Sequence, residues 1–269
     1  MNSPSLSAIH FLVIDIDGVL WNGRQPLPGV PAFFDFMNQV GVRFVIATNN
    51  SARPASDIID RLARLGAQID KSQILTSAEA TALYLPRLVP RGGRVFLVGG
   101  EGIASALILA GYQLVDHDAD AVVAGLDLTL TYDKLKRATL EIRRGSKFIG
   151  TNADKTFPGD EGLAPGAGSI LAALRAATDV APIVVGKPER AMFDLALEKM
   201  GAERPAAAML GDRLDTDIEG AQNAGLVSIL VLTGVTSRQA LAQSPIKPEF
   251  VFEDLVALHD AWQAELQTY

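Results

Sequence analysis

Short runs of apolar residues alternate with segments of helical periodicity along most of the chain. Many of these runs contain β-branched residues, as buried strands do: FLVID, RFVIATN, RVFLVG, AVVAGLD, KFIGTN, PIVVGK, AAMLGD and VSILVLTG. Between the runs, apolar residues recur every three or four positions, which predicts helices at Pro54–Leu65, Ile103–Ala110, Tyr132–Arg144, Ile170–Ala177, Ala191–Met200 and Thr216–Ala224. This alternation predicts an α/β fold, a doubly wound parallel sheet with helices on both faces.

Two acids follow the first apolar run at the point where a buried strand should end. Asp15 closes the run, Asp17 stands two positions later, and Gly18 allows the backbone to turn sharply. Residues two apart in an extended segment point to the same side, so both carboxylates can approach one site. Two carboxylates about 4 Å apart repel each other by roughly 4 kcal/mol at an effective dielectric constant near 20. We therefore expect a cation at this site; the alternative is that one acid only caps a turn.

The second apolar run, RFVIATN, leads into a hydroxyl and two amides: Thr48, Asn49 and Asn50. Consecutive backbone N–H groups that open toward a helix form a cradle for an anion, and the two amide side chains can donate further hydrogen bonds. We therefore expect these three residues to bind phosphate. The alternative is that they only form the N-cap of the helix predicted from Pro54.

Two later runs lead into charged residues. PIVVGK places Lys187 between a glycine and a proline, a turn that favours a positioned ammonium over a solvated surface charge. AAMLGD ends in Asp212, and Asp215 and Asp217 follow where the next helix should start. Acids in a first helical turn often complement the helix dipole, so one of these three acids could be structural. Three acids after one strand nevertheless exceed what capping requires.

Composition and charge narrow the classes of protein. The 269 residues are 48% hydrophobic and 20% charged, and the formal net charge of -7 argues against nucleic acid as a partner. The chain has no cysteine, which excludes disulfides and thiolate metal sites. No apolar run approaches the roughly 18 residues of a membrane span, and the N-terminal segment lacks the features of a signal peptide. We therefore expect a cytoplasmic protein with no membrane partner.

Taken together, the segments DIDGV, TNN, GKP and GDRLDTD resemble the motifs of the haloacid dehalogenase (HAD) superfamily, in the same order and each at a predicted strand end. Within the superfamily, the chain resembles subfamily IIA, the nitrophenylphosphatase-like and phosphoglycolate-phosphatase-like enzymes with a large inserted cap. The resemblance spans nearly the whole chain. It implies a Mg²⁺-dependent phosphatase that hydrolyses small-molecule phosphate monoesters through an aspartyl-phosphate intermediate.

The resemblance also implies a role for each residue that matches a motif. Asp15 takes the position of the nucleophile, and Asp17 that of the general acid and base. Asp15 and Asp212 are implied as side-chain ligands of Mg²⁺, with the backbone carbonyl of Asp17 as a third ligand. The other matches are Thr48 as the phosphate-binding hydroxyl, Lys187 as the positioned catalytic cation and Asp217 as the second acid of the last motif. An acid at position 17 resembles phosphatases and phosphomutases rather than the ATPases, which carry Thr there.

The spacing of the motifs predicts two domains. Far more chain separates Thr48 from Lys187 than one crossover connection requires, and this stretch has its own alternation of strands and helices. We expect a core of residues 1–84 and 182–269, interrupted by an α/β cap domain of residues 85–181. Proline and glycine cluster in the two linkers.

Two residues of the predicted cap are candidates for contact with the substrate. Asn152 and Asp154 lie in the polar segment GTNADKTFPGDEGLAPGAGSI; the alternative is that they form a turn and a helix cap. The substrate itself, and the cap residues that select it, cannot be read from the sequence. The resemblance further allows a homodimer formed through the cap.

Three other functions are open. RVFLVGGEGIASALILAGY resembles a dinucleotide-binding fingerprint, with Gly100 and Gly102 after a strand and acids at Asp118 and Asp120. Ser105 stands where the fingerprint has its third glycine or alanine, which argues against an oxidoreductase. A phosphotransferase or mutase on the same fold would use the same acids. A non-catalytic phosphate-binding protein would have little need of them.

Overall fold

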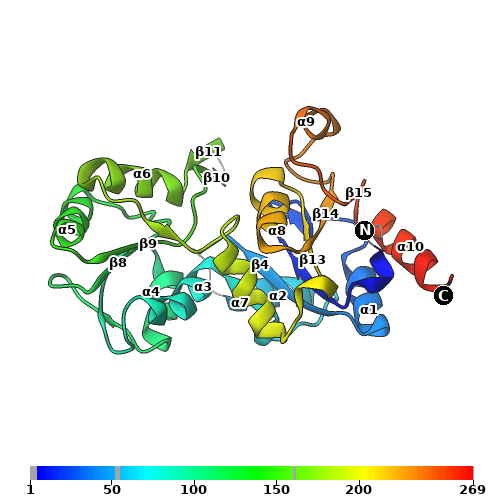
Figure 1. The fold of residues 1–269 in the computed structure, drawn as a ribbon, viewed down its shortest axis with the longest axis horizontal. Coiled ribbons are helices and arrows are strands. Elements are labelled where there is room, and N and C mark those ends of the chain that lie inside the picture. Colours follow the sequence, from blue (N-terminus) through cyan, green and yellow to red (C-terminus); the bar gives the residue numbers. More distant parts are fainter. Residues whose placement is uncertain (1–4, 52–54, 160–161, 269) are drawn as a thin grey trace. The chain divides into compact units, whose positions relative to one another are not determined.

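The computed structural model describes residues 5–51, 55–159 and 162–268 of the chain. The chain divides into two compact units (Figure 1). The core unit comprises Met1–Ala47, Ala55–Leu75 and Phe193–Tyr269, and the inserted unit comprises Thr48–Pro54 and Thr76–Met192. The domain limits expected from the sequence, at residues 85 and 181, stay a prediction.

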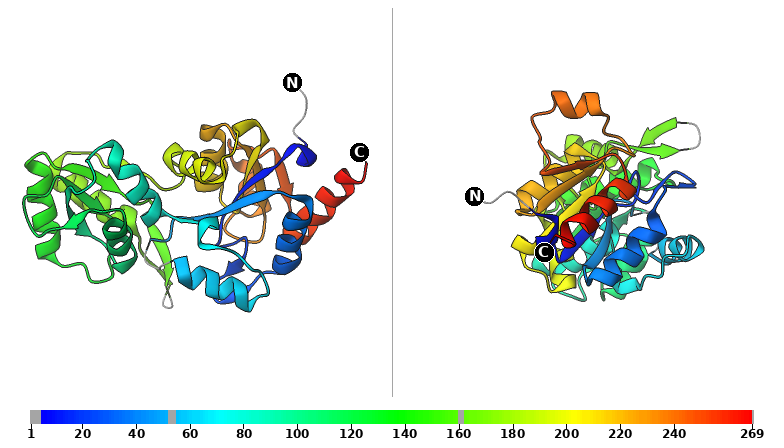
Figure 2. Two further views of the ribbon diagram at one scale, coloured as in Figure 1. Left: turned by 90° about the horizontal axis from the view of Figure 1, so that it is seen from below. Right: turned by 90° about the vertical axis from the view of Figure 1, so that its right-hand side faces the viewer.

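A six-stranded sheet forms the centre of the core unit (Figures 1 and 2). Its strand order is β15 (Phe250–Phe252), β14 (Val227–Val231), β13 (Ala207–Gly211), β1 (Phe11–Ile14), β4 (Arg43–Thr48) and β5 (Ile74–Thr76). The strands from β15 to β4 pair in parallel. The chain leaves β1 toward β4 and later returns to β13, on the other side of β1. This reversal is a topological switch point, where sheets of this kind bind ligands beyond the carboxyl ends of their strands.

Both faces of the core sheet are covered, because successive strand residues point to opposite faces and are buried on each. Leu12 and Ile14 belong to one hydrophobic cluster with residues of α1 (Val30–Val40), α2 (Ala55–Arg64) and α10 (Leu255–Leu266). Val13 and Met209, which alternate with them, are fully buried as well. Further helices are α7 (Arg190–Met200), α8 (Glu219–Ala224) and α9 (Arg238–Gln243). The predicted doubly wound α/β core is therefore confirmed.

The inserted unit is built on a second parallel sheet. Its order is β12 (Ile183–Val184), β9 (Lys147–Gly150), β8 (Ala121–Ala124), β6 (Arg94–Val98) and β7 (Gln113–Leu114). Helices α5 (Tyr132–Arg143) and α6 (Ala167–Thr178) share a hydrophobic cluster with Phe96, Val122 and Phe148, so they cover the same face. Figure 1 shows α4 (Glu101–Leu109) on the other side of this sheet, next to α3 (Ser77–Tyr84). A hairpin of β10 (Thr156–Gly159) and β11 (Gly162–Pro165) follows β9.

Every apolar run predicted as a strand forms one, and each predicted helix overlaps an observed helix. The sequence did not predict β2 (Trp21–Asn22), β3 (Gln25–Pro26), β5, β7 or β15, because two or three residues carry no measurable periodicity. Nor did it predict the four-residue strands β10 and β11, which lie in the polar segment that contains Asn152 and Asp154. Helices α1, α9 and α10 were not predicted either. Nor was α3, whose buried residues are alanine, serine and threonine rather than an apolar stripe. In the described part of the chain, no helix combines the length and the apolarity that crossing a membrane requires.

An ion pair with a buried carboxylate anchors the segment between β8 and α5 of the inserted unit. The carboxylate of Asp127 accepts hydrogen bonds from the N–H and the hydroxyl of Thr129, both at 2.8 Å, and from Lys134 Nζ at 2.7 Å. Burial alone would raise the pKa of Asp127, but the hydrogen bonds from Lys134 and Thr129 outweigh it and lower this pKa below its usual value. The charged form of Asp127 therefore stabilises the turn that leads into α5.

Replacing Asp127 by Asn should lower the free energy of unfolding by about 1–3 kcal/mol at neutral pH, because charge-assisted hydrogen bonds to a buried group are lost. The folded-state pKa lies below the reference value of 3.8, so this stabilisation is fully present above that value. It is lost as the pH falls through the folded-state pKa. Denaturant unfolding followed by circular dichroism should therefore show the difference between the variant and the wild type shrinking in strong acid.

Asp133→Asn is the matched control for this experiment. Asp133 lies in the first turn of α5 and pairs with Arg137 at 2.7 Å, but both side chains are exposed. The loss should be at most about 0.5 kcal/mol, as for exposed ion pairs four residues apart on a helix. An effect of Asp127→Asn that is equally small, or that does not change with pH, would contradict the assigned role of this carboxylate.

Candidate functional site

Three acids predicted for the site converge within the core unit. Asp15 continues from β1, with its N–H donating to the carbonyl of Leu210 at 2.9 Å, and Asp212 and Asp217 follow β13. Each of the three acids offers one carboxylate oxygen, and these oxygens lie within 4.8 Å of one another. Asp15 is 8% exposed, Asp212 1% and Asp217 0%. The switch point between β1 and β13 therefore holds three buried acids.

Close backbone contacts fix the carboxylate of Asp212. Its Oδ2 accepts a hydrogen bond from the N–H of Val235 at 2.6 Å. A Cβ atom at Gly234 would lie 1.9 Å from this oxygen, and a Cβ atom at Gly18 would lie 2.4 Å from it. Gly18 also has a φ of +84°, a conformation that favours glycine. Two glycines from distant segments therefore leave the space that this carboxylate occupies.

A π-helical turn, η5 (Leu214–Ile218), orients Asp217. The N–H groups of Asp217 and of the next residue both donate to the carbonyl of Arg213 at 3.1 Å, which widens the turn. Asp217 Oδ2 accepts hydrogen bonds from the N–H groups of Asp212 at 3.2 Å and Arg213 at 3.1 Å. Asp215, by contrast, is exposed and forms a bidentate pair with Arg213. Of the three acids that follow β13, Asp215 thus lies outside the cluster.

Asp17 has surroundings quite different from those of Asp15. Asp17 is exposed, whereas Asp15 is buried. The indole Nε1 of Trp21 donates to Asp17 Oδ1 at 3.1 Å, and the guanidinium of Arg61 lies 3.9 Å from the centroid of the Trp21 ring. The N–H of Gly18 donates to the Trp21 carbonyl at 2.8 Å and closes the turn between them. The backbone thus separates two acids that strand periodicity treats as equivalent.

The residues predicted to bind phosphate lie together in the inserted unit. The N–H of Asn50 donates to the hydroxyl of Thr48 at 3.1 Å, which orders the backbone after β4. The side chain of Asn49 accepts a hydrogen bond from the N–H of Lys187 and donates one to its carbonyl, both at 2.9 Å. Lys187 is 3% exposed. The ends of β4 and β12 therefore bring the hydroxyl, the amides and the ammonium-bearing residue into one group.

Asn152 and Asp154, predicted to face the substrate, belong to the same group. Asn152 is 3% exposed, and its Nδ2 donates to the carbonyl of Asn49 at 2.8 Å. Its Oδ1 accepts the N–H of Asp154 at 3.1 Å. Asp154 Oδ1 accepts a hydrogen bond from Asn49 Nδ2 at 3.2 Å. Contact of these two residues with a substrate stays a prediction.

The donor set of the acid cluster fits a hard divalent cation. Mg²⁺ binds oxygen at about 2.0–2.1 Å, so two ligands of one ion lie at most about 4.2 Å apart. The three oxygens, all within 4.8 Å of one another, lie close to this limit. Carboxylates at such distances repel each other by roughly 4 kcal/mol per pair at an effective dielectric constant near 20. A cation between them would remove this cost.

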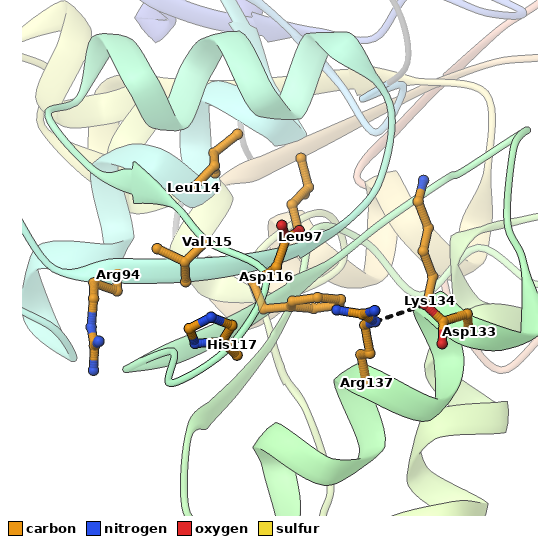
Figure 3. A pocket seen from close by; sticks show the side chains of 10 residues that line it. Arg94, Leu97, Leu114, Val115, Asp116, His117, Asp133, Lys134 and Arg137 are labelled. Atoms are coloured by element: carbon orange, nitrogen blue, oxygen red, sulfur yellow. Dashed lines mark hydrogen bonds and ion pairs between the residues drawn. The ribbon is translucent and has the colours of Figure 1, made fainter.

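A pocket of about 630 Å³ lies elsewhere in the inserted unit, beside β6, β7 and the first turns of α5 (Figure 3). Its charged side chains have both signs, and one pair, Arg137 and Asp133, forms the ion pair drawn in Figure 3. Lys134 pairs with Asp127 at 2.7 Å. The residues that line this pocket include none of the predicted site residues. This pocket is therefore distinct from the site predicted at the strand ends.

Comparison with known proteins identifies the family. A model of haloacid dehalogenase-like hydrolases matches residues 12–113, and a second, HAD-hydrolase-like model matches residues 184–258. The acid sugar phosphatase of Staphylococcus saprophyticus is 36% identical over 244 residues, which cover 90% of this chain and 94% of the relative. The chain belongs to the haloacid dehalogenase-like hydrolase family. The resemblance read from its motifs is confirmed.

Solved structures of HAD-like hydrolases share the fold of this chain. The 4-nitrophenylphosphatase of Thermotoga maritima is 38% identical, with a TM-score of 0.91, over 96% of this chain and 99% of that one. A glycerol phosphate phosphatase of Mycobacterium tuberculosis, solved in complex with magnesium, is 37% identical, with a TM-score of 0.87, over 97% of this chain and 80% of that one. These matches span the core unit and the inserted unit alike.

Several residues that shape the site of this HAD-like hydrolase were not predicted. Trp21 contacts Asp17 through its indole N–H, and the backbone of Val235 contacts Asp212. Nothing in the sequence indicates this role for Trp21, because a tryptophan that follows a strand is usually a residue of the hydrophobic core. Gly234 could have been noted, since it follows the apolar run of β14 as Gly18 follows that of β1.

Replacing Gly234 by Ala should weaken Mg²⁺ binding by about 10- to 100-fold, the range typical of groups that orient metal ligands. The new methyl group would displace the carboxylate of Asp212 from the position set by Val235. Titration calorimetry with Mg²⁺ measures the effect. Gly100→Ala is the matched control, because a Cβ there has its nearest neighbour at 3.7 Å and the φ of Gly100 is -83°. Unchanged Mg²⁺ affinity in the Gly234→Ala protein would contradict the role assigned to this glycine.

Proposed function

We propose that this chain is a Mg²⁺-dependent phosphatase that hydrolyses small-molecule phosphate monoesters through an aspartyl-phosphate on Asp15. The observation that carries the proposal is the buried cluster of Asp15, Asp212 and Asp217 at the switch point of the core sheet. Relatives named acid sugar phosphatase, 4-nitrophenylphosphatase and glycerol phosphate phosphatase support hydrolysis of phosphate monoesters. Their differing names indicate that the leaving group varies within the family.

Asp15 and Asp17 divide the chemistry between them. In the first step a carboxylate oxygen of Asp15 attacks the phosphorus atom, the bond to the leaving oxygen breaks, and Asp17 gives that oxygen its proton. In the second step water attacks the phosphorus of the aspartyl-phosphate and gives a proton to Asp17. Inorganic phosphate then leaves, and Asp15 is again a carboxylate. The burial of Asp15 and the exposure of Asp17 suit a nucleophile and a proton carrier, respectively.

Positive charge and hydrogen-bond donors must accompany this attack, because a carboxylate approaches an anionic phosphate. The ammonium of Lys187, the hydroxyl of Thr48, the backbone N–H of Asn49 and the side-chain amide of Asn50 are proposed to bind the non-bridging phosphate oxygens. Asp15 and Asp212 would hold the cation, with the carbonyl of Asp17. A bound Mg²⁺ would supply charge neutralisation at a phosphate oxygen.

The inserted unit, which contains the predicted cap of residues 85–181, is proposed to select the leaving group and to exclude water from the reaction. The sheet and helices of this unit give it a core of its own, as a separate cap requires. Formation of a homodimer through the cap and a cytoplasmic location stay predictions.

Removing divalent metal should abolish phosphate release. The prediction rests on the three buried carboxylates, whose charges need a counter-ion before an anionic ester can bind beside them. Phosphate release from a panel of monoesters should fall to background after chelation and return on addition of Mg²⁺. Full turnover in a metal-free preparation would contradict the metal requirement, although it would not affect the assignment of the fold.

Asn substitutions should separate the two acids of the first motif. Asp15→Asn keeps the shape of the side chain but removes the attacking anion, so turnover should vanish for every ester. Asp17→Asn should slow the first step by roughly 10²–10⁴-fold for an alkyl phosphate. The loss should be smaller for nitrophenyl phosphate, whose leaving group needs little protonation. Single-turnover measurement isolates this step from hydrolysis of the intermediate.

Asp215→Asn is the control for these two variants, because Asp215 is an exposed acid paired with Arg213 and lies outside the cluster. Its activity should match that of the wild type. Retained turnover in the Asp15→Asn protein, or equal losses on both kinds of ester for Asp17→Asn, would overturn the assignment of roles.

A further inference from the structure

One side chain holds both backbone polar groups of Lys187. Asn49 Oδ1 accepts the N–H of Lys187, and Asn49 Nδ2 donates to the carbonyl of Lys187, both at 2.9 Å. The carboxamide therefore pairs with Lys187 as a neighbouring strand would, with one donor and one acceptor. Two hydrogen bonds to one residue fix its orientation as well as its position, which a single bond does not.

Asn49 is itself held from three directions within the inserted unit. Its carbonyl accepts hydrogen bonds from the hydroxyl of Ser77 at 2.7 Å and from Asn152 Nδ2 at 2.8 Å. Its Nδ2 donates a further hydrogen bond to Asp154 Oδ1 at 3.2 Å. The loop that follows β4 is therefore tied to the start of α3 and to the segment that follows β9.

The fit between Asn49 and the Lys187 turn leaves no spare room. A Cβ atom at Gly186 would lie 2.6 Å from Asn49 Oδ1 and 2.5 Å from the carbonyl of Thr151. That carbonyl accepts the N–H of Gly186 at 2.8 Å. A glycine directly before Lys187 therefore lets the backbone come close enough for the carboxamide to reach both groups.

The two amide hydrogens of Asn49 are already used. An asparagine amide has two N–H donors, and here one points to the carbonyl of Lys187 and the other to the carboxylate of Asp154. The side chain therefore has no further hydrogen for a phosphate oxygen. Any effect of this side chain on phosphate must therefore pass through the groups that it holds, the backbone of Lys187 and the carboxylate of Asp154.

We propose that Asn49 is a positioning residue that sets the place of the Lys187 ammonium through its backbone, and that Asn152 and Asp154 hold Asn49 rather than the substrate. The inference rests on the proposed function, in which that ammonium binds the phosphoryl group. A reacting group displaced by about 1 Å can lose about 10²-fold in rate, so a clamp on the backbone of Lys187 has a measurable consequence.

A double-mutant cycle tests the proposal. Asn49→Ala should lower kcat/KM by about 10- to 100-fold in the otherwise wild-type protein. In the Lys187→Met protein, which lacks the ammonium, the same Asn49→Ala change should lower kcat/KM by less than about 3-fold. Losses that multiply across the cycle would overturn the proposal, because they would mean that Asn49 acts independently of the Lys187 ammonium.

Thermal unfolding of the same four proteins measures the contribution of Asn49 to stability, and the kinetic cycle measures its contribution to positioning. Asn49→Ala removes hydrogen bonds in either background, so it should lower the melting temperature to the same extent with and without the ammonium. A purely structural role would move both melting temperatures but could not make the loss of kcat/KM depend on Lys187. Gln222→Ala is the matched control: it removes an amide that donates to a backbone carbonyl, that of Lys247, at 2.7 Å, and it should leave kcat/KM unchanged.

Binding of inorganic phosphate keeps the test independent of turnover. Lys187→Met should weaken phosphate binding in the otherwise wild-type protein but have little further effect in the Asn49→Ala protein. If no ester is hydrolysed, the phosphatase proposal fails, while this binding cycle still decides whether Asn49 acts through Lys187. If hydrolysis is present and both cycles are multiplicative, the positioning role fails and the phosphatase proposal stands.

Discussion

The mutual repulsion of three buried carboxylates is the constraint on which the rest of the core unit depends. Asp15, Asp212 and Asp217 would each be far more stable in water than beside one another. Backbone hydrogen bonds offset part of the unfavourable free energy of burying these groups. The N–H of Val235 donates to Asp212, and Asp217 accepts hydrogen bonds from two N–H groups of the segment that carries Asp212. These contacts fix the directions of the carboxylates but leave their charges in place. A site built in this way is selective for a cation before any substrate arrives.

Sheet topology explains why such a cluster can exist at all. Parallel strands present their carboxyl ends at one edge, and the reversal between β1 and β13 opens that edge at a single point. The acids then need little more than short turns to meet. The inserted unit also has polar residues just beyond the carboxyl ends of its parallel strands, where Asn152 follows β9 and Lys187 follows β12. In both units the first residues beyond the strands supply the polar and charged side chains of the predicted site.

The sequence predicts the scaffold well because buried parallel strands are long enough to show a continuous apolar pattern. It also predicts Asp15, Asp212 and Asp217 as neighbours, since each follows a strand of the same sheet. The different surroundings of Asp15 and Asp17 could not be predicted, because periodicity ends where the turn at Gly18 begins. Periodicity alone does not separate Asp215 from Asp217, since their different positions depend on how far the turn η5 unwinds; only the resemblance to the last motif singles out Asp217.

The sequence likewise does not show which groups the side chain of Asn49 contacts. An amide at a strand end has both donors and an acceptor, and only the fold shows that its partners are the backbone groups of Lys187. Two segments that lie more than a hundred residues apart in the chain must first come together before that pairing exists. Motif spacing gives the residues of a site, whereas the partners of each residue follow from tertiary contacts.

The indole of Trp21 gives the protein a built-in optical reporter. The chain has two tryptophans, and the other, Trp262, is 1% exposed and packs against Phe36 in the hydrophobic core. Trp21 differs from it in its polar neighbours, because its N–H is bonded to a carboxylate and its ring lies against the guanidinium of Arg61. A ligand that reaches Asp17 should therefore change the emission of Trp21 without any label. The same indole that orients an acid thus makes the state of that acid visible in the fluorescence of the unmodified chain.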